Sequence, residues 1–118
     1  MTDPASRLRQ EIALGEFLAS LEGKLVRVTQ TLSSRSGADV AKRSATQVRF
    51  RFRVKTSFLA MTGGRHFTLY GDDGDTAYAF NPAFLSDFAH SGDGATITES
   101  YGSDAERGTT LEVLPDAM

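Results

Sequence analysis

A strict alternation of apolar and cationic side chains occupies the middle of the chain and restricts how it can fold. Within residues 47–55 the apolar set is Val48, Phe50, Phe52 and Val54, and the cationic set is Arg49, Arg51, Arg53 and Lys55. Successive side chains of a β-strand point to opposite faces of its sheet, so a strand would bury the first set and expose the second. A helix would scatter the apolar set around its circumference. The segment is therefore predicted to be a strand with one core face and one cationic face.

The composition is that of an ordinary folded protein. The chain has 118 residues, of which 40% are hydrophobic and 24% charged, and it contains no cysteine. This size suits one hydrophobic core, so residues 1–118 are predicted to form a single domain without disulfides or thiolate metal sites. No apolar run reaches the roughly 20 residues of a bilayer span, and acids interrupt the first twenty residues, unlike a secretory signal. A cytoplasmic location without membrane contact is expected.

The N-terminal third indicates a helix, a strand and a loop. Asp3 followed by Pro4 is typical of a helix start, and a helix is predicted over residues 4–22 with one apolar stripe. Residues 24–32 alternate as a strand does. Residues 33–44 are rich in serine, glycine and basic residues without a period, which indicates a mobile loop.

The remaining chain predicts two hairpins and a short helix. Residues 65–70 and 76–80 are predicted strands joined by an Asp- and Gly-rich turn, and residues 95–101 and 109–114 form the second predicted hairpin. Residues 82–90, after Asn81, are predicted to be a short helix. The predicted fold class is α+β: a strongly curved antiparallel sheet or partly open barrel of about six strands. The N-terminal helix packs on it, and the short helix lies between strands 4 and 5.

The charge distribution points to one unusual face. The net charge is −2, but residues 1–65 carry 12 cations against 5 acids, and residues 66–118 carry 1 cation against 10 acids. Cations at alternate positions of a strand stand about 6.6 to 7 Å apart, close to the phosphate spacing of an extended single strand. The candidate anion-binding residues are Arg27, Arg49, Arg51, Arg53, Lys55, His66, Tyr70 and Tyr78 on the predicted outer face, with Arg35, Lys42 and Arg43 in the predicted loop.

These residues favour a non-enzymatic binding module whose basic sheet face holds an anionic partner. Single-stranded nucleic acid or an acidic protein segment would suit it, with nucleic acid favoured. The competing structural interpretation is a solvated strand whose charges prevent edge-to-edge pairing and are neutralised by acids of the loops. Neither an RNA-recognition motif nor a zinc-finger spacing is present.

Two further function classes stay open at this stage. The chain could be a protein-interaction or inhibitor subunit, in which the acidic second half docks on a basic partner or on the basic half of a second copy. It could also be a small-ligand or enzyme site inside the curved sheet, using His66, Tyr70 and Tyr78. Sedimentation at low and high salt would separate a homo-oligomer from a monomer that binds nucleic acid.

The sequence supports no metal or cofactor site. The acids around Gly74 lack the spacing of a calcium loop, and Asp- and Gly-rich segments are typical of turns. His66 and His90 belong to no catalytic motif, so no catalytic residue is assigned and a binding protein is favoured over an enzyme.

Overall fold

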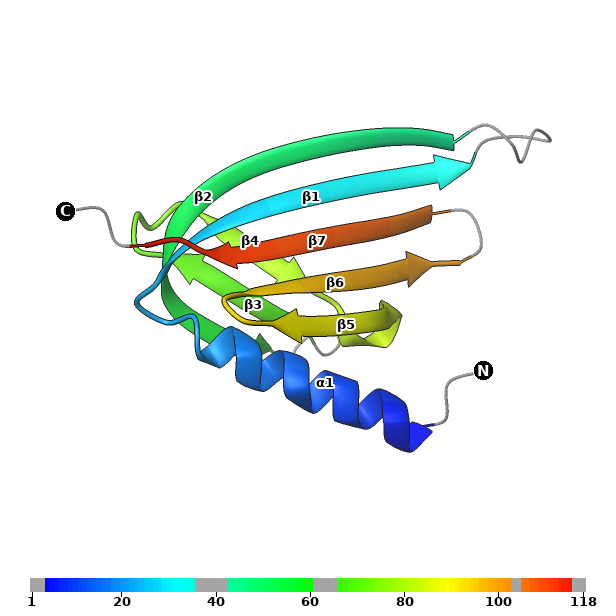
Figure 1. The fold of residues 1–118 in the computed structure, drawn as a ribbon, viewed down its shortest axis with the longest axis horizontal. Helices are drawn as coiled ribbons and strands as arrows, with labels where there is room; N and C mark the ends of the chain where they lie inside the picture. The colour runs from blue at the N-terminus through cyan, green and yellow to red at the C-terminus, as the bar shows by residue number, and fades with distance from the viewer. Residues whose placement is uncertain (1–3, 36–42, 61–65, 103–104, 116–118) are drawn as a thin grey trace.

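The computed structural model describes residues 4–35, 43–60, 66–102 and 105–115. They form one helix and a strongly curved antiparallel sheet with strand order β4-β3-β2-β1-β7-β6-β5, which resembles half of a barrel (Figure 1). The elements are α1 (Pro4–Ala19), β1 (Leu25–Arg35), β2 (Arg43–Ala60), β3 (His66–Gly71), β4 (Ala77–Phe80), the 3-10 turn η1 (Pro82–Phe84), β5 (Leu85–Ser91), β6 (Gly94–Tyr101) and β7 (Ala105–Val113). The predicted α+β class with a curved antiparallel sheet is confirmed, with seven strands instead of about six.

The long strand β2 gives the sheet much of its curvature. It is 18 residues long, and its register against β3 shifts between Val54 and Thr56, as in a β-bulge. Bulges bend a strand and increase its twist. β2 therefore pairs with β1 along its first part and with β3 along its last part, so that it connects the two sides of the half-barrel (Figure 1).

Both ends of the loop predicted over residues 33–44 are strand instead. Residues 33–35 continue β1 and residues 43–44 begin β2, and Arg35 lies opposite Arg43 in the register. Residues 36–42 lie outside the described part of the chain, and Lys42 is among them.

The prediction of a short helix over residues 82–90 is wrong. The Asn81 side chain accepts a hydrogen bond from the Ala83 N–H at 3.0 Å, but the turn it begins ends after three residues. The chain then pairs with β6 as strand β5. A register shift between Leu85 and Asp87 places Leu85 and Phe88, three residues apart, against the same core. A bulge in a strand thus reproduced the apolar spacing of a helix.

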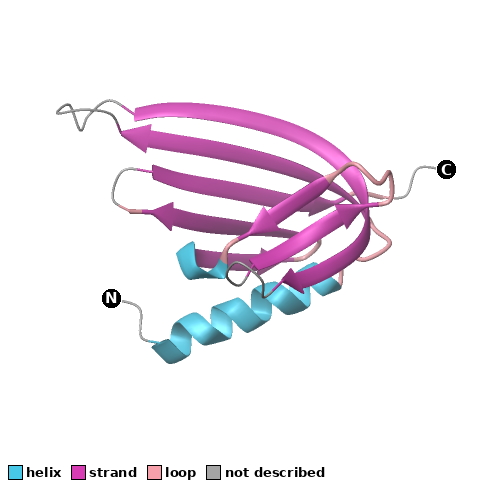
Figure 2. Cartoon of the chain, turned by 180° about the vertical axis from the view of Figure 1, so that it is seen from behind, coloured by secondary structure: helices cyan, strands magenta, loops and turns pink. Residues whose placement is uncertain are grey.

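The core lies between α1 and the concave face of the sheet (Figure 2). Its fully buried side chains include Leu14 and Leu18 of α1, Val26 of β1 and Leu111 of β7. The helix stripe predicted from the sequence therefore faces the sheet, and burial of such side chains drives folding. None of the described helices is long and apolar enough to cross a membrane.

Candidate basic face and the interior polar cluster

The cations of β1 and β2 lie side by side on the outer face of the sheet. The register places Arg27 directly opposite Arg51, with Glu112 of β7 on the other side of Arg27. Arg49 lies opposite Thr29, one pleat further along the same face. Residues opposite each other on neighbouring strands have Cβ atoms about 5 Å apart, and diagonal neighbours are about 7 to 8 Å apart. Arg27, Arg49 and Arg51 thus form one compact group, which we call the basic face.

These cations differ in how strongly the chain engages them. Arg49, Arg51 and Lys55 are exposed, and within the described ranges no hydrogen bond or ion pair involves their side chains. Arg53 is half-buried, and its Nη1 donates to the Gly23 carbonyl at 2.8 Å. Arg27 Nη1 lies 4.0 Å from Glu112 Oε1, at the outer limit of an ion pair. Arg53 thus has a structural role, whereas Arg49 and Arg51 are available to a partner.

Arg27 and Arg51 face each other on neighbouring strands, and this pairing does not stabilise the sheet. Like charges directly across a strand pair are unfavourable, although water and salt keep the cost of such exposed charges below about 1 kcal/mol. A stabilising pattern would place a carboxylate opposite Arg51. An anion bound over the face would remove this repulsion.

Two exposed aromatic rings lie on the outer side of the sheet beyond the basic face. Phe58 of β2 is 52% exposed and Tyr70 of β3 is 44% exposed. Tyr70 lies opposite Thr56 and Phe58 opposite Thr68, which makes the two rings diagonal neighbours. Simple alternation from buried Val54 would place Phe58 in the core, so sequence reasoning missed it. The bulge after Val54 reverses which side chains of β2 face the core, and nothing in the sequence predicts this bulge.

The remaining predicted site residues fall in different places. His66 is half-buried at the start of β3, opposite Ala60. Arg35 and Arg43 pair at the far ends of β1 and β2, six residues of β2 away from Arg49, or about 20 Å along a strand. The fold therefore brings together only part of the predicted set of anion-binding residues.

The placement of Tyr78 on the outer face is wrong. Tyr78 and Phe80 are buried, whereas Ala77 and Ala79 of the same strand are exposed. The two large rings are two residues apart, so they share one face, and they pack edge to face with centroids 5.1 Å apart. Burying these rings removes far more apolar area from water than burying two alanines. Tyr78 therefore belongs to the interior.

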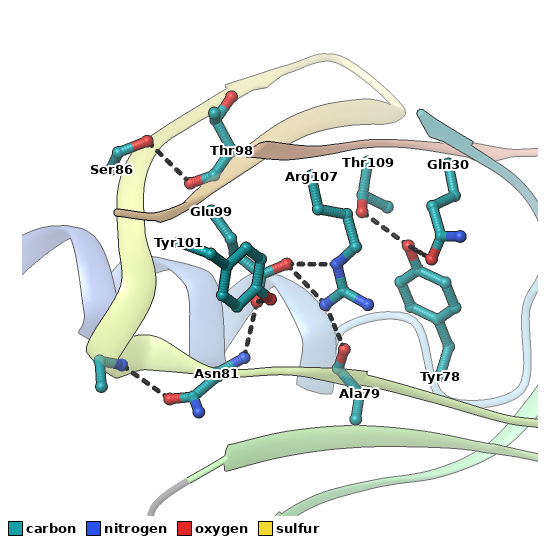
Figure 3. Close-up of polar contacts among 11 residues, drawn as sticks. Gln30, Tyr78, Ala79, Asn81, Ser86, Thr98, Glu99, Tyr101, Arg107 and Thr109 are labelled. Carbon is teal, nitrogen blue, oxygen red and sulfur yellow. Dashed lines mark hydrogen bonds and ion pairs between the residues drawn. The ribbon is translucent and has the colours of Figure 1, made fainter. Parts of the chain in front are cut away.

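Inside the half-barrel, Tyr78 connects the edge strand β4 to strands on the opposite side. Its hydroxyl donates to Gln30 Oε1 at 3.1 Å and is hydrogen-bonded to Thr109 Oγ1 at 2.7 Å (Figure 3). Burial raises the pKa of Tyr78 above its ordinary value, so the hydroxyl keeps its proton at neutral pH.

A buried ion pair lies beside Tyr78. Glu99 of β6, with a side chain 1% exposed, accepts from Arg107 Nε at 2.7 Å and also pairs with Nη2 of that guanidinium. Its other oxygen accepts the Asn81 N–H at 2.8 Å and the Tyr101 hydroxyl at 3.2 Å (Figure 3). Arg107 Nη2 also donates to the Ala79 carbonyl. Glu99, Arg107 and Tyr78 form what we call the polar cluster, and it ties β4 to β6 and β7 across the concave side.

The guanidinium of Arg107 also contacts aromatic faces. Its central carbon lies 5.1 Å from the ring centroid of Tyr78 and 5.6 Å from that of Phe80. Cation–π contacts at such distances are favourable, more so where water is excluded. Within the described chain every buried side-chain nitrogen and oxygen has a hydrogen-bond partner. The polar cluster therefore holds β4 against the strands on the other side of the half-barrel.

The acidic turn between β3 and β4 uses its main carboxylate for its own backbone. Asp73 Oδ1 accepts the N–H groups of Asp75 and Thr76 at 2.9 Å, and its Oδ2 accepts the Thr76 hydroxyl at 2.6 Å. The Thr76 hydroxyl, more than the two amides, holds the pKa of Asp73 below its ordinary value. In the described chain no group of three metal-ligating side chains comes together. The Asp72 N–H donates to the Arg53 carbonyl, so this turn borders the end of the cationic row.

Comparison with known proteins supports the fold. No protein-family model matches the sequence, and no curated protein is similar to it. The crystal structure of the Bacillus subtilis YojF protein superposes with a TM-score of 0.63 at 9% sequence identity, over 92% of this chain and 94% of that one. The chain therefore shares the fold of that protein.

Proposed function

We propose that this protein is a non-enzymatic binding module that holds an anionic polymer on the outer face of its sheet, and that single-stranded nucleic acid is its preferred ligand. One observation carries the proposal. Arg49 and Arg51 are exposed beside Arg27, and within the described chain neither guanidinium has a carboxylate partner. Guanidinium groups suit phosphate because their donors match its oxygens in a bidentate geometry.

The exposed rings favour nucleic acid over other polyanions. Bases of a single strand stack on aromatic side chains, and each stacked base contributes about 1 to 3 kcal/mol. Phe58 and Tyr70 offer two such rings on the outer side of the sheet. A duplex exposes no unstacked base to such rings, so they add nothing to its binding.

The curvature of the sheet also favours a flexible ligand. The basic face lies on the convex side of a half-barrel. Duplex DNA is stiff over about 150 base pairs and would touch a convex surface over a short stretch only. A single strand can follow the curve, and more of its phosphates can reach the cations.

The test is the affinity for a fluorescently labelled 20-nucleotide single strand, measured by anisotropy. Arg49→Gln with Arg51→Gln is expected to raise Kd by about tenfold or more, because two phosphate contacts are lost. The matched control is Arg49→Lys with Arg51→Lys, which keeps both charges and is expected to stay near the wild-type affinity. Equal affinities of the wild type and the glutamine variant would refute the proposal.

An acidic protein segment is the second ligand that the basic face could accept. It would meet the same cations but would gain little from Phe58. Phe58→Ser separates the two: it should weaken oligonucleotide binding about fivefold or more and leave binding of poly-glutamate unchanged. Arg53 is left intact in both tests, because its bond to Gly23 is structural.

A further inference from the structure

Helix α1 carries a second apolar stripe that does not face the core. Leu8 and Ile12 are 52% and 53% exposed, although both are large aliphatic side chains. The stripe consists of Ala5, Leu8, Ile12, Gly15 and Ala19. Its spacings alternate between three and four residues, which is the pattern of a seam between two packed helices.

A hollow of about 530 Å³ lies along this stripe, between α1 and strands β2 and β3. It is lined by Leu8, Glu11, Ile12, Gly15, Glu16 and Ala19 from the helix and by Ser57 and Phe67 from the sheet. A Cβ on Gly15 would lie 3.1 Å from the Phe67 ring, so the ring reaches the helix at this point. The hollow is mostly apolar, with the two glutamates on its helix side, and it is open to solvent, so it can receive side chains from another molecule.

Two copies of this stripe are complementary in shape when the helices run in opposite directions. Its first half has the bulky Leu8 and Ile12, and its second half has the small Gly15 and Ala19. In an antiparallel pair of α1 helices, Leu8 of each copy lies opposite Ala19 of the other, and Ile12 lies opposite Gly15 and the Phe67 ring that packs on it. Bulky side chains then enter the hollow beside the small residues, as close packing requires.

The charges on the flank of the stripe are complementary in the same sense. Arg9 and Glu16 are exposed and seven residues apart, so they occupy equivalent positions along the seam. In an antiparallel pair, equivalent flanking positions of the two helices meet. Arg9 of each copy would therefore meet Glu16 of the other, and a two-fold axis produces this pair twice.

We propose that the Leu8–Ile12 face of α1 is the interface of a two-fold symmetric homodimer, in which the two α1 helices pack antiparallel. Helix α1 lies on the concave side of the sheet (Figure 1), whereas the basic face lies on its outer side. The dimer thus leaves both basic faces accessible. It is independent of the nature of the ligand.

The test is the mass of the protein in solution, measured by light scattering and sedimentation equilibrium up to about 100 µM, where weak interfaces associate. The wild type is expected to be a dimer and Ile12→Glu a folded monomer. The control is Leu32→Glu, which places the same charge on an exposed apolar residue of β1 and should stay dimeric. A wild type that is monomeric throughout this range would overturn the proposal, as would a dimer that Leu32→Glu breaks and Ile12→Glu does not.

Charge reversal tests the antiparallel geometry. Arg9→Glu alone and Glu16→Arg alone should each weaken the dimer about tenfold or more, because both symmetric pairs become repulsive. The double variant restores both pairs and should recover most of the affinity. A double variant as weak as the single ones would overturn the arrangement. Oligonucleotide binding by the Ile12→Glu monomer is measured separately, so failure of either proposal is visible on its own.

Discussion

Replacement of Arg107 by methionine is the sharpest test of what closes the half-barrel. Methionine keeps an unbranched apolar stem that can pack on the rings of Tyr78 and Phe80, so little apolar contact is lost. The guanidinium, with its bonds to Glu99 and to the Ala79 carbonyl, disappears. Glu99 then remains as a buried carboxylate that keeps only the Asn81 N–H and the Tyr101 hydroxyl.

The expected loss of stability follows from the burial of the pair. The side chains of Glu99 and Arg107 are 1% and 16% exposed. Removing one partner of such a buried pair costs about 3 to 5 kcal/mol, because the remaining charge has lost its compensation. Glu99→Gln with Arg107→Met removes both charges, and it should be more stable than Arg107→Met alone by about 1 to 3 kcal/mol.

The free energy of unfolding is measured by urea titration with far-UV circular dichroism, because the chain has no tryptophan. Exposed Arg49→Met is the matched control and should change stability by less than about 0.5 kcal/mol. An Arg107→Met variant within about 1 kcal/mol of the wild type would refute the reasoning, since the polar cluster would then not secure β4.

Three further predictions concern the core, the interior hydroxyl and the acidic turn. Leu18→Ala should lower the free energy of unfolding by about 2 to 5 kcal/mol, because Leu18 is fully buried. Burial raises the pKa of Tyr78 above its ordinary 10.0, so the unfolded chain loses this proton first. Stability should therefore fall as the pH rises above about 10, and Tyr78→Phe should reduce that fall in urea titrations. Thr76→Ala should move the pKa of Asp73 up toward 3.8, measured by NMR titration, because the hydrogen bond that lowers this pKa most, from the Thr76 hydroxyl, is lost.

The parts of the fold that follow a single period could be predicted from the sequence. Residues 47–55 alternate without interruption, and the structure has them within β2. Phe52 and Val54 are buried and Phe50 is partly buried, whereas Val48, predicted to be buried with them, is 46% exposed. The apolar stripe of α1 likewise packs on the sheet. In both segments the period alone identifies the element, although in β2 it does not show where the core ends.

Two of the errors occur where a bulge changes the period. At β5 the register shift near Leu85 produced helix-like spacing, and at β2 the shift after Val54 turned Phe58 outward. Bulges depend on pairing between strands, which the sequence of one strand does not contain.

The polar cluster could not be predicted for a similar reason. Glu99 and Arg107 lie on two strands of a hairpin, and their contact depends on the register of β6 against β7. The third member, Tyr78, comes from the opposite edge of the sheet. Only the closed half-barrel brings these three side chains together, and no spacing along the chain encodes that closure.

The most direct test of the basic face is the salt dependence of its affinity for a labelled single strand. Each phosphate contact contributes about −0.7 to the slope of log K against log salt for single strands. Contacts from the three arginines of the basic face and from the exposed Lys55 of β2 predict a slope of about −2.8, and Arg49→Gln with Arg51→Gln should bring it to about −1.4. A slope near zero for the wild type, or one that the double variant leaves unchanged, would contradict binding at this face.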